Sequence, residues 1–549
     1  MSERISWARS LPGITIAAGV AIALTACAGS SGGSGNGSAQ EIAFSDTTPA
    51  GATALPEIVW NLPYGEPTSL DPAFSSSESN SSVVANMCES LLLQNPDFTT
   101  SPNLASVEQT DDVTFEVSID DRATFWDGSP VTADDVKFSM ERLRSDALGS
   151  TWAGVLSNIA SIDIANDREL TIRLSQPDVL FAAHLATPAA AVVQKKFAEA
   201  AGEFGSAADG VMCSGPFELV KWSIGQDITL DKHAEYWNPE GAAVSDALRF
   251  TFNTDAASAA TALQNGEVTG SYNFPVSALS TLEKSAGSLT FGTSLGLYGI
   301  MTINTDLGPL KDPKIREALE LAIDYDGIIE GVFGGAAVVN KTFTPRSAWG
   351  YSVPIFEAAW DAVQAGTTDL DRAKALVEEA GAPSDPIVLA YYADLPEDAQ
   401  VAASVQASAR SIGLEIELKA QTSAENIAMY FEEEARTGID MMVWAGYLDA
   451  PEPAAYYQYY TSDGVFNVAG FSNPEFDDLV TTSRETIDDD ARAELVTQAQ
   501  AIYAENRINF PIISQYTRLY MAEGVSGAVA SQAFYYSPWA AKVGGIDAA

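Results

Sequence analysis

The sequence predicts an α/β protein with mixed sheets, built from more than one lobe. The chain has 549 residues, and a usual domain size of about 150 residues suggests roughly three lobes. Hydrophobic residues make up 46% of the chain and charged residues 19%, a composition that supplies large cores and argues against disorder. Segments of strand and helix periodicity also interleave without a strict repeat, which favours α/β lobes with mixed sheets.

The net charge of −45 restricts the partners of the protein. Such an acidic surface repels phosphate backbones, so we expect no nucleic-acid partner. The acids are dispersed along the chain rather than gathered in a tail, and the simplest interpretation of their number is solubility.

Residues 1–26 have the features of a secretory signal peptide. Arg4 and Arg9 precede an apolar stretch at 14–24, which is shorter than the ~20 residues of a spanning helix. We therefore expect an exported protein.

The signal ends Leu24-Thr25-Ala26-Cys27, which resembles a bacterial lipobox. The resemblance implies cleavage before Cys27 and a diacylglycerol on its thiol, and a chance cysteine is the alternative. The following residues are rich in Gly and Ser, so we interpret 27–55 as a flexible tether. Together these features predict a lipid-anchored protein on the outer face of the plasma membrane.

Two cysteines remain, Cys88 and Cys213. An even number of cysteines in an exported chain predicts a disulfide between them. Two buried free thiols are the alternative.

The N-terminal half contains four segments with clear signals. A short strand is expected at 57–61 and a helix at 80–93. Residues 163–174 alternate as a half-buried strand does, and 217–230 have the pattern of two strands around a Gly turn.

A capping box marks one helix start in this half. The Thr132 hydroxyl can accept the amide of Asp135, whose carboxylate reaches back. Val136, Met140 and Leu143 then fall on one face, so a buried helix face is expected there.

Helix signals dominate the C-terminal half. Asp312-Pro313 and Asn473-Pro474 each place a cap before a first-turn proline. Amphipathic helices are expected at 371–380 and 401–411, and a strand at 414–418.

Signatures of catalysis and metal binding are missing from the sequence. The two histidines, His184 and His233, stand far apart without acid spacing, and there is no HExxH, CxxC or P-loop motif. We therefore expect no cofactor and no metal, and we do not expect an enzyme. The abundant carboxylates leave a secreted hydrolase as the alternative.

Seven blocks of the sequence carry a family resemblance. The most specific is FWDGSPVTADDVKFSMERL, residues 125–143. The others are CSGPFELVKW (213–222), LDKHAEYWN (230–238), the long run 301–329, DLDRAKALVEEAG (369–381), NPEFDDL (473–479) and INFPIISQY (508–516). In type and order these blocks resemble family 5 extracellular solute-binding proteins, the dipeptide-, oligopeptide- and nickel-binding components of bacterial ABC importers.

The resemblance implies a two-lobed periplasmic-binding-protein-like clamp of type II. Lobe I would span 56–300, with an extra subdomain inserted at about 90–207, and lobe II would span 301–514. Residues 515–549 would return to lobe I. The solute would bind in the cleft between the lobes.

The resemblance also implies a function. The protein would capture peptides by cleft closure and deliver them, as a monomer, to an ABC permease whose ATPase is a separate subunit. The shortage of histidine argues against a nickel chelate.

The stretch WAGYLDAPEPAAYYQYY, residues 444–460, carries the main candidate site. In the peptide-binding relatives an aspartate four residues before a proline holds the α-ammonium of the ligand, and Asp449 with Pro453 matches that spacing. An exposed loop acid is the alternative. The other candidates for substrate binding are Trp444, Gly446, Tyr447 and Leu448 beside it, and Phe74, Ser75 and Ser76 in a lobe I loop.

One departure from the family bears on the ligand. Dipeptide binders carry an arginine for the peptide carboxylate in a segment that aligns with 390–397, and this chain has none there. Oligopeptides therefore fit the sequence better than dipeptides. The same fold binding an oligosaccharide or another small nutrient is the alternative.

Overall fold

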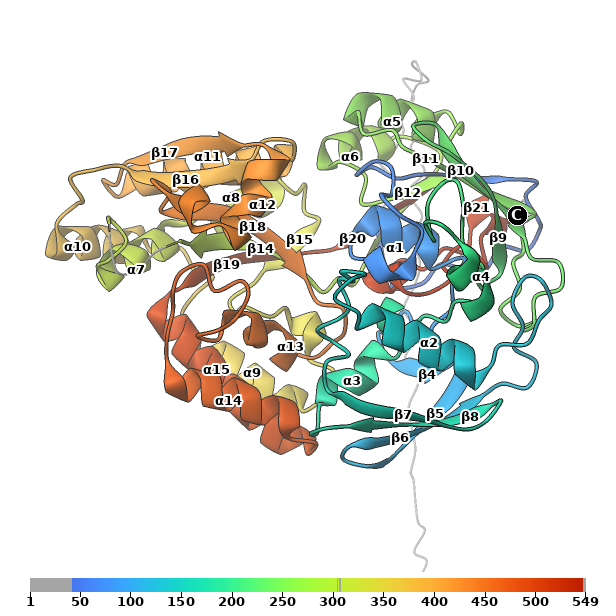
Figure 1. The fold of residues 1–549 in the computed structure, drawn as a ribbon. Helices are drawn as coiled ribbons and strands as arrows, with labels where there is room; N and C mark the ends of the chain where they lie inside the picture. Colours follow the sequence, from blue (N-terminus) through green and yellow to red (C-terminus); the bar gives the residue numbers. More distant parts are fainter. Residues whose placement is uncertain (1–41, 304, 306–307, 547–549) are drawn as a thin grey trace, which may run out of the picture. The chain divides into compact units, whose positions relative to one another are not determined.

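Two large β-sheets organise the chain, one of eight strands and one of six (Figure 1). The structure is a computed structural model that describes residues 42–303, 305 and 308–546. The predicted signal peptide, Cys27 and the first part of the predicted tether lie outside these residues. Within the described ranges, no helix has the length and apolarity needed to cross a membrane.

The eight-stranded sheet belongs to lobe I and draws on both ends of the chain. Its order is β1-β13-β20-β12-β2-β11-β10-β9. Strand β20 comes from the C-terminal part of the chain and lies between β13 and β12. The bounds are β1 Ala43–Phe44, β2 Ile58–Asn61, β9 Phe217–Ser223, β10 Asp227–Lys232, β11 Ala247–Thr251, β12 Gly270–Tyr272, β13 Ser288–Gly292 and β20 Thr517–Met521.

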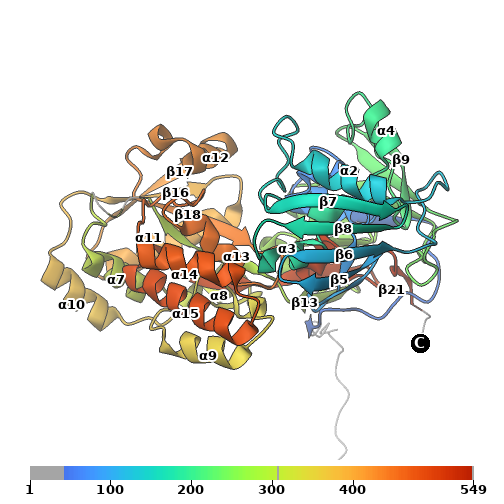
Figure 2. The ribbon, with the colours of Figure 1, turned by 60° about the horizontal axis from the view of Figure 1, so that its bottom comes forward.

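A separate four-stranded sheet, in the order β5-β6-β8-β7, forms the subdomain inserted in lobe I. Figure 2 shows these strands side by side, with α2 lying near β7. The bounds are β5 Ala105–Asp111, β6 Thr114–Ile119, β7 Ile159–Asn166 and β8 Glu169–Leu174. The helices of lobe I are α1 Glu78–Val84, α2 Ala133–Leu143, α3 Val179–His184, α4 Lys195–Ala200, α5 Ala256–Gln264 and α6 Leu279–Leu282.

The six-stranded sheet forms lobe II in the order β15-β19-β14-β18-β16-β17. The bounds of its strands are β14 Gly296–Thr302, β15 Ala337–Val339, β16 Ile387–Tyr392, β17 Ile416–Gln421, β18 Met441–Tyr447 and β19 Asn509–Gln515. The helices are α7 Pro313–Ala322, α8 Tyr325–Gly331, α9 Val353–Ala362, α10 Leu370–Ala380, α11 Pro396–Ser411, α12 Ser423–Phe431, α13 Ala454–Tyr457, α14 Pro474–Glu485 and α15 Asp489–Asn506.

Strand β18 shows how lobe II is layered. Met441 and Val443 pack into the core that includes residues of α7, α8, α10 and α11. Met442 and Trp444 pack into the core that includes residues of α9, α13, α14 and α15. Alternate side chains of a strand point to opposite faces, so these two groups of helices cover opposite faces of the sheet.

The chain passes between the two large sheets at two places, from β13 to β14 and from β19 to β20. The η7 turn, Gln532–Tyr535, fixes one of them. The Gln532 Oε1 accepts the Leu295 amide (2.8 Å), and its Nε2 donates to the Leu448 carbonyl (3.2 Å). A lobe I side chain thus connects this crossing to the residue before Asp449.

Most predicted elements are present. The capping box forms at α2, where Asp135 Oδ2 accepts the Thr132 amide (3.0 Å). The two strands expected at 217–230 are β9 and β10, and the amphipathic helix expected at 371–380 is α10.

The helix predicted at 80–93 is wrong in its second half, because α1 ends at Val84 and β3, Leu92–Gln94, pairs there with β4, Thr100–Pro102. The Met87 carbonyl accepts the Gly215 amide (2.8 Å), and the Glu89 carbonyl accepts the Val192 amide (3.0 Å). These carbonyls accept hydrogen bonds from neighbouring segments rather than from amides of a continuing helix.

The single strand predicted at 163–174 is a hairpin of β7 and β8, since the chain turns between Asn166 and Glu169.

Part of the predicted tether is folded rather than flexible. Strand β1 pairs in parallel with β13, and Thr53 forms a bridge with Gly545 in β22, Gly544–Gly545. Strand β22 itself pairs with β21, Val525–Ser526. The lobe boundaries given above stay predictions.

Cys88 and Cys213 form a disulfide, as predicted. The bridge closes a loop across a sequence separation of 125 residues, which contains the four-stranded sheet. It therefore fastens both ends of the inserted subdomain to the base of lobe I.

Candidate functional site

The end of β18 carries the candidate segment to the junction between the lobes. Gly446 lies where a side chain would not fit, because a Cβ there would lie 2.5 Å from the Trp444 ring and 2.8 Å from the Tyr456 hydroxyl. Glycine at this position thus permits the close approach of the strand to both rings.

Trp444 and Leu448 have packing roles. Trp444 is 7% exposed and stacks on Phe343, with ring centroids 5.1 Å apart. Leu448 is 2% exposed and belongs to the same core of lobe II. These two candidates therefore hold the segment in place through the core of lobe II, while their neighbours Gly446 and Tyr447 line a cavity.

A cavity of about 160 Å³ lies between the lobes. Gly446 and Tyr447 line it from lobe II, and Asn273 and Tyr535 line it from lobe I. The Tyr447 ring packs edge-on against Tyr535, with centroids 5.2 Å apart. Two of the predicted site residues therefore line this cavity together with Tyr535 of the C-terminal return. Sequence reasoning did not identify Tyr535 as a site residue.

A second cavity, of about 430 Å³, begins just beyond Asp449. Ala450 and Glu452 line it from lobe II, and Gln94 and Phe98 line it from lobe I. The Gln94 Nε2 donates to the Asp449 carbonyl (3.0 Å). The chain from Gly446 to Glu452 thus runs from one cavity to the other, with Asp449 between them.

The Asp449 side chain is half-buried and faces aromatic residues. Its Oδ1 accepts a hydrogen bond from the Tyr536 hydroxyl, and the Tyr536 ring packs edge-on against Trp152 at 6.0 Å. Burial raises the pKa of Tyr459 to about 12, and the charge of Asp449 adds to this rise. The carboxylate therefore lies among rings that shield it from water.

Burial raises the pKa of Asp449 above its ordinary value, although nearby His184 and the bond from Tyr536 oppose the rise. His184 is itself buried, and its pKa is lowered by that burial. Among the described residues, Asp449 forms no ion pair with a lysine or arginine. The site thus presents a desolvated carboxylate whose charged form a cation would stabilise.

Glu452, three residues further along, differs from Asp449 in this respect. Its Oε2 lies 3.1 Å from the Arg492 Nε, and its Oε1 accepts the Tyr351 hydroxyl (2.8 Å). The Arg492 guanidinium also lies over the Tyr351 ring at 3.9 Å. Glu452 is therefore satisfied within lobe II, and of the two acids only Asp449 lacks a cation.

The lobe I loop with Phe74, Ser75 and Ser76 reaches the same junction. The Ser76 carbonyl accepts the Tyr447 hydroxyl (3.0 Å), which joins the two lobes. The Ser75 hydroxyl is buried and lies 3.1 Å from the Ser81 hydroxyl, and Phe74 packs against the core of lobe I. Ser76 thus offers its backbone at the junction, while the other two side chains support the loop.

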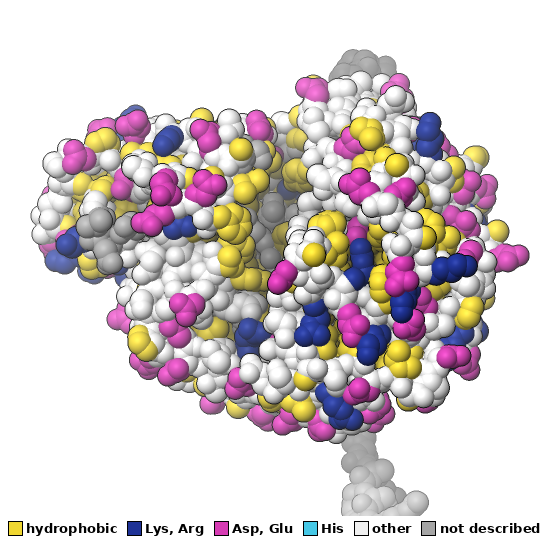
Figure 3. Space-filling model, in the orientation of Figure 1, with side chains coloured by type: hydrophobic (Ala, Val, Ile, Leu, Met, Phe, Trp, Pro, Cys, Tyr) yellow, Lys and Arg dark blue, Asp and Glu magenta, His cyan; other side chains and the backbone are white. Residues whose placement is uncertain are grey.

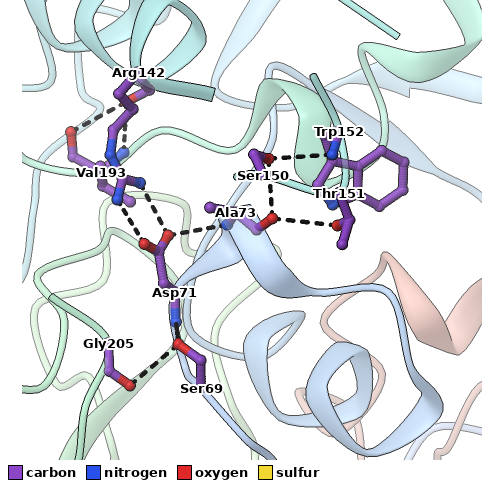
Figure 4. A network of polar contacts seen from close by, with 10 residues as sticks. Ser69, Asp71, Ala73, Arg142, Ser150, Thr151, Trp152, Val193 and Gly205 are labelled. Atoms are coloured by element: carbon purple, nitrogen blue, oxygen red, sulfur yellow. Dashed lines mark hydrogen bonds and ion pairs between the residues drawn. The ribbon is translucent and has the colours of Figure 1, made fainter. Parts of the chain in front are cut away.

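A buried ion pair holds this loop in place (Figure 4). The Arg142 Nη1 donates to Asp71 Oδ1 (2.9 Å), and its Nη2 pairs with Oδ2 (2.5 Å). The Asp71 carboxylate also accepts the Ala73 amide (2.9 Å). Helix α2, which carries Arg142, therefore positions the turn η1, Pro72–Phe74.

Glu78 is a second buried acid beside the smaller cavity, and sequence reasoning missed it. Its Oε2 accepts Asn273 Nδ2 (2.7 Å) and the Tyr535 hydroxyl (3.2 Å). Burial raises the pKa of Glu78 to about 7. No sequence pattern marked it, because its partners lie some 195 and 457 positions away along the chain.

The face drawn in Figure 3 has acidic side chains scattered over both lobes and is hollowed between them. Within the described part of the chain, no group of three or more His, Cys, Asp and Glu side chains could hold a metal ion. The predicted lipid site at Cys27 lies outside the described residues.

Comparison with known proteins shows relatives over most of the chain. The E. coli (strain K12) "Dipeptide-binding protein" is 27% identical over 397 residues, covering 68% of this chain and 71% of that protein. The "Periplasmic oligopeptide-binding protein OppA" of Salmonella typhimurium is 25% identical over 461 residues, covering 79% and 83%.

Solved structures share the fold. An ABC transporter substrate-binding protein, CtaP of Listeria monocytogenes, superposes with a TM-score of 0.78 at 21% identity, covering 91% of this chain and 100% of that one. The oligopeptide-binding protein AppA of Bacillus subtilis, in complex with a nonapeptide, gives a TM-score of 0.73 at 22% identity, with coverage of 91% and 100%. These likenesses support the two-lobed type II clamp.

The family model described as "Bacterial extracellular solute-binding proteins, family 5 Middle" matches residues 99–467, more than half of the chain. It describes proteins that bind solutes rather than enzymes. The matched range includes the capping-box helix, the disulfide partner Cys213 and the Asp449 segment. The chain therefore belongs to the family 5 bacterial extracellular solute-binding proteins.

Proposed function

We propose that the protein is the substrate receptor of an ABC importer and that its solute is a peptide. Relatives along most of the chain are named for dipeptides and oligopeptides, and a structural neighbour from Helicobacter pylori was solved with the peptide STSA. The receptor captures the peptide between the lobes and passes it to a membrane permease. It acts as a monomer.

The observation that carries this proposal is the unpaired, half-buried carboxylate of Asp449 at the junction of the lobes. A buried carboxylate is costly unless a cation accompanies it. The α-ammonium of a peptide supplies such a cation, and it replaces the hydroxyl of Tyr536 as the partner of Asp449. Binding of an ammonium also favours the ionised carboxyl, so it lowers the raised pKa of Asp449.

Oligopeptides suit the site better than dipeptides. The segment 390–397 has no arginine or lysine, so nothing there holds a carboxylate close to the ammonium site. A longer peptide places its carboxylate further away, and its main chain pairs with backbone groups of the cleft.

A thermal-shift series tests the class of solute. A ligand selective for the folded state raises the unfolding midpoint, so peptides of two to eight residues are compared with di- and oligosaccharides of similar mass. The proposal predicts that peptides longer than two residues raise the midpoint and that sugars do not. A midpoint raised only by saccharides would replace the peptide with the alternative solute, within the same fold.

The lipid anchor at Cys27 belongs to the same proposal. Labelling of cells that express the full-length sequence with an alkyne fatty acid should mark the mature protein that begins at Cys27, and Cys27→Ala should remove the label and release the protein from membranes. A labelled Cys27→Ala variant would rule out this cysteine as the site of the lipid.

A further inference from the structure

The hairpin of β3 and β4 in lobe I has an unusual residue in its turn. The turn reads Asn95-Pro96-Asp97-Phe98-Thr99, and Phe98 has a φ of 64°. Turns of the pattern x-P-D-G-x have a glycine where Phe98 stands, because glycine adopts a positive φ without a steric clash. A bulky residue in this conformation is strained, and such strain is found where a side chain has a function.

Local hydrogen bonds hold Phe98 in the strained conformation. The Asn95 amide donates to the Thr99 carbonyl, and the Phe98 amide donates to the Asn95 carbonyl, both at 2.8 Å. The Thr99 hydroxyl also donates to Asp97 Oδ1 (2.6 Å). The turn thus fixes the direction of the Phe98 side chain.

The backbone of this hairpin is fastened to lobe I. At its base, the Leu92 amide donates to the Leu185 carbonyl (3.0 Å). At its turn, the Ser531 hydroxyl donates to the Pro96 carbonyl (2.6 Å). The hairpin is therefore held by the inserted subdomain at one end and by the C-terminal return at the other.

Two side chains of the hairpin reach lobe II instead. Phe98 is 5% exposed and lies in the hydrophobic core that includes residues of α13, α14 and α15. The buried Gln94 donates from its Nε2 to the Asp449 carbonyl (3.0 Å). Separation of the lobes would withdraw an apolar ring from this core and break a hydrogen bond, and both changes cost free energy.

The same two side chains border the candidate site. Gln94 and Phe98 line the cavity of about 430 Å³ beyond Asp449, together with Ala450 and Glu452 of lobe II. The hairpin therefore forms part of the cavity wall on the lobe I side. It also holds the backbone of the residue that we expect to bind the ammonium.

From these features we propose that the β3–β4 hairpin, residues 92–102, is a latch of the clamp. Phe98 stabilises the closed lobes, and Gln94 positions the Asp449 backbone as the lobes close. The left-handed conformation directs the ring toward lobe II in advance, so closure orders fewer degrees of freedom. The latch rests on the capture by closure proposed above but not on the identity of the solute.

Pulsed electron paramagnetic resonance on the full-length protein without solute tests the latch. Spin labels are attached at Glu108→Cys on β5 and Glu494→Cys on α15, two exposed positions on different lobes. The wild type should show two distances, of which the one that the structure has belongs to the closed lobes. A wild type with the open distance alone would overturn the proposal, because a latch within the chain closes the lobes without solute.

Substitutions at the turn separate a latch from ordinary core packing. Phe98→Gly relieves the strain and removes the ring, so the ratio of closed to open lobes should fall at least ~10-fold. Phe98→Leu keeps an apolar side chain there and should retain most of the closed population. Ile224→Gly removes a side chain that is 73% exposed at another hairpin turn of lobe I, and it should leave the ratio unchanged.

An unchanged ratio in Phe98→Gly would overturn the latch. If the thermal midpoint fell while the ratio stayed the same, Phe98 would have a packing role alone. Because no solute is present, neither result depends on whether peptides bind. A thermal-shift series without a response to peptides would count against the proposed solute and leave the latch standing.

Gln94→Leu tests the second contact and leaves the turn intact, so it also serves if Phe98→Gly does not fold. The loss of one hydrogen bond to the Asp449 carbonyl should lower the ratio of closed to open lobes about fivefold. A ratio equal to that of the wild type would refute the role of Gln94 in the latch.

Discussion

Asp449 and Glu452 are two acids of one short segment with different roles. Glu452 is 6% exposed and paired with Arg492, so its charge is neutralised within lobe II. Asp449 accepts only a neutral tyrosine hydroxyl and lies close to a buried histidine. The difference in partners, rather than a difference in residue type, makes Asp449 the candidate for a ligand ammonium.

Substitution of Asp449 by alanine should weaken peptide binding strongly. A buried ammonium without its carboxylate loses about 2–5 kcal/mol, at least ~30-fold in affinity. Isothermal titration calorimetry with the peptide that gives the largest thermal shift measures this change.

Asp463→Asn provides the control for this substitution, because Asp463 is an exposed acid of the same lobe, close in sequence. Its affinity for the peptide should equal that of the wild type. Equal affinities for all three proteins would remove the anchor role of Asp449.

At the scale of elements, α14 of lobe II is joined to the N-terminal end of α3 in lobe I. The Arg484 Nη2 lies 2.7 Å from Asp178 Oδ2, and Asp178 also accepts the Asn158 Nδ2 (2.7 Å). Asp178 caps α3 through the Leu180 amide (3.1 Å). Any separation of the lobes at this point must break the ion pair.

Arg484→Gln should therefore lower peptide affinity indirectly, through the loss of the ion pair with Asp178 rather than of a contact with the peptide. The variant leaves the Asp178 side chain, 4% exposed, without its cation in the joined state. Arg484 is partly exposed, so we expect a loss on the order of 1 kcal/mol, about fivefold. Arg372→Gln, which removes an exposed pair within lobe II, serves as the control in the same calorimetry.

The disulfide is the second feature at this scale. Replacing Cys88 and Cys213 together by serine removes a cross-link that closes a loop across 125 residues. The free energy of unfolding should fall by roughly 2–5 kcal/mol, measured by denaturant unfolding under non-reducing conditions. An unchanged midpoint would show that the subdomain is held by packing alone.

For the whole molecule, four buried acids make stability depend on pH. Burial raises the pKa of Glu78, Glu89, Glu320 and Asp398 to about 7 each. The folded protein thus keeps protons that the unfolded chain releases above about pH 4.5. The free energy of unfolding should fall as pH rises from about 4.5 through 7, so the thermal midpoint should be higher at pH 5.5 than at pH 8.

Glu78→Gln should flatten this dependence, because the amide keeps an acceptor for Asn273 and Tyr535 but does not titrate. The reduction is on the order of 1–3 kcal/mol between the two pH values. Glu494→Gln, at an exposed position of α15, should leave the dependence as in the wild type. A thermal midpoint that rises with pH in the wild type would contradict this explanation.

The sequence predicted much of the architecture from local signals. The capping box at Thr132, the cap at Asp312 before α7 and the strand pair around Gly225 depend on contacts over a few residues, so the local patterns that predicted them match the fold. The disulfide followed from counting cysteines in an exported chain. The two-lobed clamp, by contrast, followed from the family resemblance.

The wrong helix end and the site residues that were not predicted have one cause, which is contact between segments far apart in the sequence. The helix predicted beyond Val84 is replaced because carbonyls of Met87 and Glu89 bind segments distant in sequence. Sequence reasoning also missed Tyr535 and Tyr536, which meet the Asp449 segment only because the C-terminal return lies in lobe I. No local pattern in the sequence indicates which of the many acids has no lysine or arginine partner in the folded protein.

The affinity of the wild-type protein for one tetrapeptide and for its N-acetylated form tests the central claim most directly. Acetylation removes the positive charge that we expect Asp449 to bind and leaves the rest of the peptide unchanged. Titration calorimetry should show a loss of at least ~30-fold on acetylation. Equal affinity for the two peptides would contradict an ammonium site at Asp449.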